Sequence, residues 1–219
     1  METKAGGYVV VYEGGQGEII EKKSRFIANV RPVETEEEAV AFINEMKKQY
    51  WDARHNCSAF VLGERQEMTR CSDDGEPAQT AGRPMLDVLL KEGITNVAVV
   101  VTRYFGGVLL GTGGLVRAYQ AATQAGLAAS RLIEKCRGSK LCIHTDYNGL
   151  GKLQHLFGQS GISILDTEYA ADVKLTILVP MDRKEQTYKE VVEQTNGAAQ
   201  LEWMEDVVYA LLGKEVVLF

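Results

Sequence analysis

The sequence predicts an α+β protein of two domains, the second of which is ferredoxin-like. Strand-like segments of alternating or continuous apolar residues recur between segments with helical spacing. Residues 96–119 form a glycine-rich stretch between a buried-strand pattern and a helical one. Beyond residue 138 the segments follow the order β-α-β-β-α-β of a ferredoxin-like domain. We therefore expect domains at residues 1–135 and 138–219.

The first part begins with three short strand patterns, at residues 8–11, 18–22 and 26–30, separated by turn residues. Thr35 and Glu38 have the spacing of a capping box, which predicts a helix that ends near Tyr50. A strand is expected through Leu62, and Pro84 suits the first turn of another helix.

The glycine-rich stretch is the strongest functional signal in the chain. A run of β-branched and small residues from Val97 to Val101 predicts a buried strand, and a helical pattern starts near Leu115. Strand, glycine loop and helix in this order can direct backbone N–H groups and a positive helix end at an anion, and Arg103 and Arg117 bracket the loop. The glycines between them are Gly106, Gly107, Gly111, Gly113 and Gly114. Tight turns and close helix–strand packing explain the glycines equally well, so both interpretations stay open.

Two familiar phosphate-binding motifs do not fit this stretch. A dinucleotide fingerprint that starts at Gly111 requires glycine or alanine where Val116 stands. A P-loop requires a Gly-Lys-Ser/Thr ending, and the stretch has none.

An acidic turn precedes it, with Asp73, Asp74 and Glu76 within four residues. Three carboxylates can hold a magnesium ion, form a solvated turn, or pair with Arg83, Arg103 or Arg117. We favour the readings without a metal. His55 precedes a strand and has polar neighbours. It can be a structural hydrogen-bonding residue or a catalytic base.

The segment K-K-S-R-F places three cations within four residues, including Lys23 and Arg25. A solvated sheet edge is the ordinary interpretation of such a cluster.

The second part predicts strands at 141–145, 162–168, 173–179 and within 201–211, with helices at 150–157 and from Asp182. Its fold alone does not define a function, so we interpret it as a binding or docking module.

Composition and charge exclude several classes. The chain has 219 residues and a net charge of −6, with 17 basic against 18 acidic residues up to residue 137 and 7 against 12 after it. Neither part is the strongly basic domain typical of nucleic-acid binders, so any RNA contact requires a local patch. No apolar run is long enough to span a membrane, and the first residues lack a signal core. The four cysteines form no zinc-like spacing, and we expect buried free thiols in a cytoplasmic protein.

Several blocks closely resemble the IMPACT family and its bacterial YigZ-like branch. They are D-D-G-E-P at 73–77, T-A-G-R-P-M-L at 80–86 and the stretch at 96–119, with K-S-R-F at 23–26 and the histidine segment at 54–57. The resemblance implies a first domain with the α+β fold of a ribosomal-protein domain and of GHMP kinases. It implies a second domain similar to the last domain of elongation factor G, which contacts the ribosome. The resemblance also implies that eukaryotic relatives are translation regulators with a further N-terminal domain, which we do not expect in this chain, so their partner is not transferred to it.

Together these observations favour a non-catalytic regulator linked to translation that binds RNA or the ribosome. The expected anion- or nucleic-acid-binding residues are Arg103, Tyr104, Gly106, Gly107, Gly111, Gly113, Gly114, Arg117, Lys23 and Arg25. The expected pocket residues are His55, Asp73, Asp74, Glu76 and Arg83. We expect no cofactor and no resident metal, a monomer, and a possible protein partner for the second domain. The alternative is an enzyme for a phosphorylated small molecule, with Mg²⁺ at residues 73–76 and His55 as general base.

Overall fold

The structure is a computed structural model that describes residues 7–213 and 215–219. The chain forms two compact units, Tyr8–Glu134 and Lys135–Phe219, which are described separately below. This is the mixed α+β, two-domain fold predicted from the sequence.

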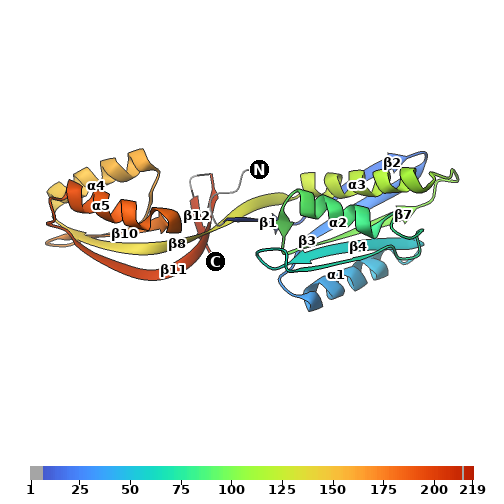
Figure 1. The fold of residues 1–219 in the computed structure, drawn as a ribbon, viewed down its shortest axis with the longest axis horizontal. Helices are drawn as coiled ribbons and strands as arrows, with labels where there is room; N and C mark the ends of the chain where they lie inside the picture. The colour runs from blue at the N-terminus through green and yellow to red at the C-terminus, as the bar shows by residue number, and fades with distance from the viewer. Residues whose placement is uncertain (1–6, 214) are drawn as a thin grey trace. The chain divides into compact units, whose positions relative to one another are not determined.

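The first unit is built on a five-stranded sheet in which every neighbouring pair is antiparallel (Figure 1). In spatial order its strands are β2 (Gln16–Glu21), β3 (Ser24–Pro32), β7 (Val97–Tyr104), β4 (His55–Leu62) and β5 (Met68–Ser72). A separate strand, β1 (Tyr8–Glu13), pairs in parallel with the short β6 (Ile94–Thr95). The continuous apolar run of β7 places that strand in the centre of the sheet, where both of its faces are covered.

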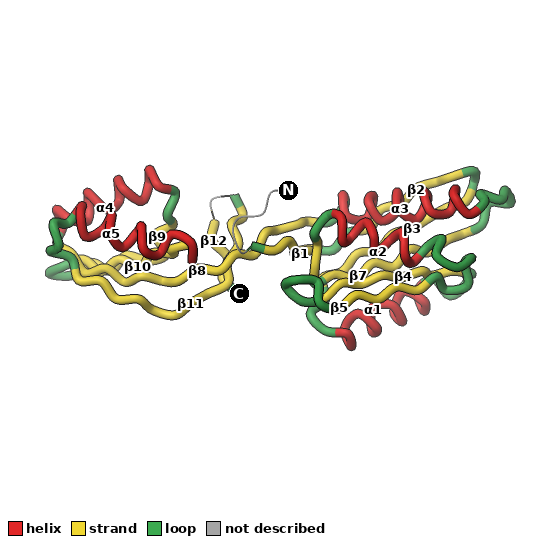
Figure 2. The backbone as a smooth tube through the Cα atoms, viewed as in Figure 1, coloured by secondary structure: helices red, strands yellow, loops and turns green. Residues whose placement is uncertain are grey.

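Helices cover both faces of this sheet (Figure 2). Helices α2 (Gly82–Lys91) and α3 (Thr112–Ala128) pack on one face, and α1 (Glu36–Gln49) packs on the other. The core under α2 and α3 includes Phe26, Cys57, Val99, Val101 and Tyr119. Side chains alternate between the faces along β7, so Arg103 points to the same face as Val101.

The predicted cap of α1 is present, with one difference. Thr35 Oγ1 accepts the N–H of Glu38 at 3.2 Å, but the Glu38 carboxylate accepts the N–H of Glu34 at 2.7 Å instead of that of Thr35. The reciprocal bond of the capping box therefore lies one residue earlier than predicted.

The second unit has the predicted ferredoxin-like order. Its elements are β8 (Arg131–Thr145, which begins in the first unit), α4 (Tyr147–Ser160), β9 (Ser163–Tyr169), β10 (Val173–Pro180), α5 (Lys184–Gln194), β11 (Gln200–Leu212) and β12 (Glu215–Leu218). They form an antiparallel sheet in the order β12-β11-β8-β10-β9, with α4 and α5 packed over one apolar face. Strand β12 is an addition that the sequence pattern did not predict.

Two local expectations are corrected, and one strand continues where the sequence pattern changes. Residues 137–139, where the sequence pattern changes, lie inside the single strand β8, and the Cβ of a side chain at Gly138 would lie 2.9 Å from the carbonyl oxygen of Val179. Glycine at this position suits the close packing of the strands. The helix expected from Asp182 begins at Lys184 instead, because Asp182 lies in a 3₁₀ turn (Met181–Arg183) before α5. Cys71 is exposed on β5, whereas the other three cysteines are buried as expected.

Within the residues that the structure describes, no helix is long and apolar enough to cross a membrane.

Gly17 on β2 tests the packing of α3 against the sheet. A Cβ at this position would lie 2.3 Å from the carbonyl carbon of Ala125, so the helix would have to move. We expect Gly17→Ala to lower the free energy of unfolding by about 2 kcal/mol, measured by urea denaturation. The control is Gly151→Ala in α4, where a Cβ meets nothing within 4 Å. An unchanged stability for Gly17→Ala would show that this contact is not tight.

Candidate functional site

The glycine loop connects β7 to α3 and is shaped by close backbone approach. The N–H of Gly106 donates to Ser24 Oγ at 3.2 Å, and a Cβ at Gly106 would lie 2.0 Å from the carbonyl carbon of Lys23. Gly107 and Gly111 have φ values of +82° and +72°, in the left-handed region that favours glycine. The loop is therefore seated against the β2–β3 turn, which brings Lys23 beside it.

Helix α3 begins directly after this loop without a capping side chain. Its N-cap is Gly111, and its first turn holds no acidic residue. Gly113 and Gly114 belong to that first turn, where N–H groups have no partner within the helix. The helix start thus carries a positive partial charge that no side chain of its own offsets.

Arg103, the first of the two bracketing arginines, lies in the interior. Its side chain is paired with Glu76, with Arg103 Nη1 and Glu76 Oε1 2.7 Å apart, and the two residues are only 7% and 8% exposed. The hydroxyl of Tyr119 donates to the same Glu76 oxygen at 2.8 Å. The Arg103 guanidinium also lies 5.4 Å from the ring centre of Phe26, which contacts Tyr119 edge-to-face. Arg103 therefore neutralises a buried carboxylate and does not face a ligand at the surface.

Burial keeps two further members of this network protonated. Desolvation raises the pKa of the Cys57 thiol and the pKa of the Tyr119 hydroxyl far above their ordinary values. The single proton of the Cys57 thiol has two acceptors within reach, the Asp73 carbonyl at 3.0 Å and the Tyr119 hydroxyl at 3.3 Å from Sγ. We assign both groups to structure, because neither provides a nucleophile or base near neutral pH.

The acidic turn is held in place by its own carboxylates. Asp73 accepts three backbone N–H groups at 2.8–3.0 Å, those of Gln79, Ala81 and Gly82 at the start of α2. This arrangement ties the turn to the α2 N-terminus, where an anion is stabilised.

Asp74 and His55 join the same turn to β4. Asp74 accepts the N–H of Asn56 at 2.7 Å and pairs with Lys47 at 2.6 Å. His55 Nδ1 lies 3.0 Å from the Asp74 carbonyl oxygen, and the Cα register pairs His55 with Arg103 across the sheet. His55, Arg103 and the acidic turn are thus neighbours in space.

The bonds of these carboxylates argue against the alternative of a magnesium site at residues 73–76. Of the three carboxylates, Glu76 contacts Arg103, and each of the three already accepts a hydrogen bond from the protein. Among the described residues, no group of three or more His, Cys, Asp or Glu side chains is placed to hold a metal ion. This matches the third interpretation of the acidic turn, in which its carboxylates pair with an arginine, since Glu76 pairs with Arg103.

The remaining predicted residues lie nearer to solvent. Arg25 pairs with Glu18 at 2.6 Å, and Arg83 pairs with Asp87 at 2.8 Å across one helical turn. The hydroxyl of Tyr104 donates to Asp52 at 2.8 Å.

Four exposed cations form a surface that we name the cationic end. They are Lys22, Lys23, Arg54 and Arg117. Lys22 and Lys23 form the β2–β3 turn, with φ values of 45° and 67°. Arg54 precedes His55 at the start of β4, and Arg117 Nη1 lies 3.8 Å from where a Cβ of Gly113 would be.

None of these four side chains has an ion pair or hydrogen bond to another residue in the described part of the chain. Sequence reasoning identified Lys23 and Arg117 but missed Arg54. The sequence pattern could not indicate Arg54, because Arg54 lies beside the end of β7 only through the register in which β4 pairs with β7.

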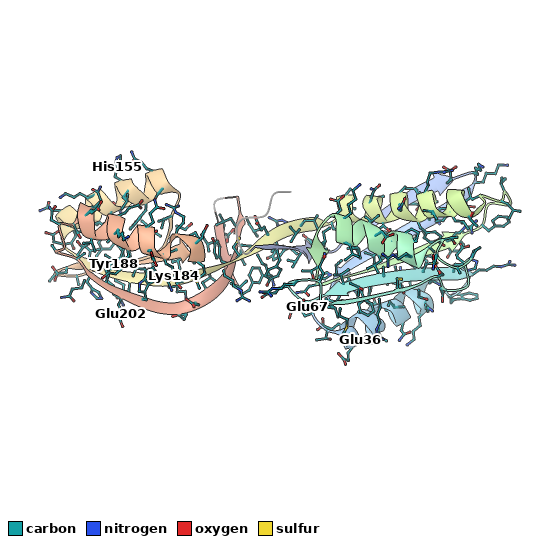
Figure 3. The ribbon with its side chains drawn as sticks, in the orientation of Figure 1. Glu36, Glu67, His155, Lys184, Tyr188 and Glu202 are labelled. Atoms are coloured by element: carbon teal, nitrogen blue, oxygen red, sulfur yellow. The ribbon has the colours of Figure 1, made fainter. Side chains whose placement is uncertain are left out.

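The second unit holds a polar cluster that the sequence did not indicate. Lys184 Nζ donates to Ser139 Oγ at 2.8 Å and lies 4.5 Å from the ring centre of Trp203, and Ser139 donates to Asp206 (Figure 3 labels Lys184). Hydrogen bonding from Ser139 holds the pKa of Asp206 below its ordinary value. These groups satisfy one another, so we interpret the cluster as a link between α5 and the sheet.

The fold and this site define a two-domain α+β protein whose first domain presents a glycine loop between a central strand and a helix. Comparison with known protein families also gives two separate regions of the chain. The family model "Impact N-terminal domain" matches residues 22–127, and "Domain of unknown function (DUF1949)" matches residues 143–198. The chain is 40% identical over 194 residues to IMPACT family member YvyE of Bacillus subtilis (strain 168), covering 89% of each chain. The chain belongs to the IMPACT family.

Other relatives show how far the similarity extends. IMPACT family member YigZ of Escherichia coli (strain K12) is 36% identical and is matched over 82% of this chain and 89% of its own. Protein IMPACT of Mus musculus is 35% identical over 98 residues, which cover 42% of this chain and 30% of that protein. A crystal structure of a hypothetical protein matches 91% of this chain and 98% of its own, with a TM-score of 0.57 and 33% identity.

The buried ion pair can be tested by removing its negative charge. Glu76→Gln keeps the shape but leaves the Arg103 cation buried without an anion, so we expect the free energy of unfolding to fall by about 3 kcal/mol. The control is Asp87→Asn, which removes an exposed partner of Arg83 and should cost less than about 0.5 kcal/mol. Urea denaturation measures both. Equal effects of the two variants would contradict a special role for the buried pair.

Proposed function

We propose that the chain is a non-catalytic regulator linked to translation, and that its first unit binds the phosphate backbone of RNA, free or within the ribosome. The observation that carries the proposal is the cationic end, where four exposed and internally unpaired cations surround the glycine loop and the start of α3. Unpaired lysine and arginine side chains beside a helix N-terminus are groups that bind phosphate.

The charge distribution supports a local interaction. Arg103 and Arg25 are neutralised by Glu76 and Glu18, so the available charge comes from the β2–β3 turn, the start of β4 and the first turns of α3. Phosphate contacts of this kind release counterions, so the affinity should fall steeply with salt.

Family membership supports the link to translation. The chain shares its first domain with eukaryotic proteins named IMPACT, and the resemblance described above implies that such relatives regulate translation. The second unit carries more acidic than basic residues, which suits contact with a protein partner better than contact with RNA.

The first test removes two cations from the cationic end. We expect Lys23→Ala combined with Arg117→Ala to weaken binding of a labelled 20-nucleotide RNA about tenfold, and to reduce the slope of log K against log salt by about 1.4. Fluorescence anisotropy between 50 and 200 mM salt measures both quantities, and cosedimentation with purified ribosomes separates free RNA from the assembled particle.

The matched control is Arg65→Ala combined with Lys91→Ala. Arg65 lies beyond the far end of β4, and Lys91 is the last residue of α2. Both are exposed, so their loss removes the same charge from elsewhere on the unit. Absence of salt-sensitive RNA or ribosome binding in the unaltered protein, or equal loss in both double variants, would refute the proposal.

The second test places a negative charge at the start of α3 and compares it with a neutral side chain of nearly the same shape. Gly113→Asp places a carboxylate in the first turn beside Arg117, where it competes with phosphate, whereas Gly113→Asn has nearly the same shape without the charge. Since an acidic residue suits a helix N-terminus, the fold should persist in both. We expect the aspartate variant to bind RNA at least fivefold more weakly than the asparagine variant at the same salt concentration. Equal affinities would remove α3 from the proposed binding surface.

A further inference from the structure

Two aromatic side chains are exposed at the same end of the first unit as the cationic end. Trp51, just after α1, is 82% exposed, and Phe105, just after β7, is 54% exposed. Their segments are joined by the 2.8 Å hydrogen bond from Tyr104 to Asp52, because Tyr104 precedes Phe105 and Asp52 follows Trp51. Both rings therefore belong to the end of the sheet where β7 finishes.

The two rings lie toward opposite faces of that end. Phe105 lies toward the α3 face, since its ring centre is 5.6 Å from the guanidinium of the inward-pointing Arg103. Trp51 belongs to the α1 side, because Tyr104 alternates with Arg103 along β7 and reaches Asp52 from that face. A bound strand that crosses the end of the sheet can meet one ring after the other.

The Phe105 ring is also held in place from inside. Arg103 is fixed by its ion pair with Glu76, and its guanidinium contacts Phe105 by a cation–π interaction. The ring thus has an anchored side and a side open to solvent. A pre-positioned aromatic face loses little conformational entropy on binding, which favours stacking of a planar ligand.

Exposed rings combined with unpaired cations are the two components of a surface for unpaired nucleic acid. Bases of a single strand stack on aromatic side chains while lysine and arginine follow the phosphates. A duplex keeps its bases stacked internally and offers such a surface mainly its backbone.

We infer that the RNA bound at the cationic end is unpaired, with one base stacked on Phe105 and another on Trp51, and with its phosphates held by Lys22, Lys23, Arg54 and Arg117. This inference rests on the proposed function and adds to it the kind of RNA that is bound. Val108 and Leu109 at the tip of the glycine loop have no π face, and we assign them no base.

The experiment compares a 12-nucleotide single-stranded RNA that cannot fold with a 12-base-pair RNA duplex, each labelled and titrated with the full chain. We expect Phe105→Leu and Trp51→Leu each to weaken binding of the single strand about tenfold, within the range for loss of one stacked base. Binding of the duplex should change less than twofold, and the salt slope should stay unchanged, because no charge is removed. The control is Tyr188→Leu in α5, which removes an aromatic side chain that is 42% exposed in the second unit (Figure 3).

A second readout reports stacking directly. The chain has two tryptophans, so Trp203→Phe leaves Trp51 as the only one. Its fluorescence should be quenched on addition of the single strand and not on addition of the duplex.

The outcomes separate the inference from the proposed function. Selective loss of single-strand binding in both leucine variants, with quenching, supports it. Equal binding of both RNAs with no effect of the leucine variants overturns the inference and leaves phosphate binding at the cationic end intact. Loss of both RNAs together overturns it as well, since the rings would then act on the fold. No binding of either RNA by the unaltered protein overturns the proposed function, and the inference falls with it.

Discussion

The buried pair between Arg103 and Glu76 is the interaction on which the structure around the glycine loop depends. Desolvating two charges costs several kcal/mol per ion, and the cost is offset only by close geometry and further hydrogen bonds. Both are present here, since the ions are 2.7 Å apart and Tyr119 donates to the same carboxylate oxygen. The pair joins the end of β7 to the acidic turn, which Asp73 in turn fastens to the start of α2. The end of β7 is thereby fixed to the acidic turn and the start of α2, which precede it in the sequence.

This interior pairing explains why the charges at the surface are available. Three acidic residues near the glycine loop accept bonds from inside the unit: Glu76 from Arg103, Asp74 from Lys47 and Asn56, and Asp52 from Tyr104. With these carboxylates occupied, the outward-facing cations have no acidic partner in the described structure. A base whose carboxylates are held by internal bonds, with unpaired cations on its rim, is well suited to a ligand that supplies its own negative charge.

Much of the fold followed from periodicity, and the exceptions have physical reasons. Helix α1 was evident from Thr35 and its apolar face, and the ferredoxin-like order was evident from alternating segments. Strand β5 was missed because all of its residues are exposed, which leaves no alternation to detect. In the candidate site, the sequence pattern selected both arginines but could not show the direction in which each charge points. Arg103 and Arg117 look alike in the sequence, yet their positions on β7 and α3 make one buried and the other exposed. That difference depends on strand register and helix phase, which a linear pattern does not specify.

The net charge of −6 first argued against RNA binding, and screening shows why that argument is weak. At physiological ionic strength, charges interact appreciably only within about 8 Å, so acidic residues farther away than this contribute little at the cationic end. What matters is the balance within that distance, where the four cations form no ion pair with another described residue. At low salt the screening length grows to about 30 Å at 0.01 M, and the acidic remainder of the chain then opposes the approach of a polyanion. The gain in affinity on lowering the salt should therefore flatten below the value that local phosphate contacts alone would produce, which distinguishes a local cationic surface on an acidic protein from a generally basic nucleic-acid binder.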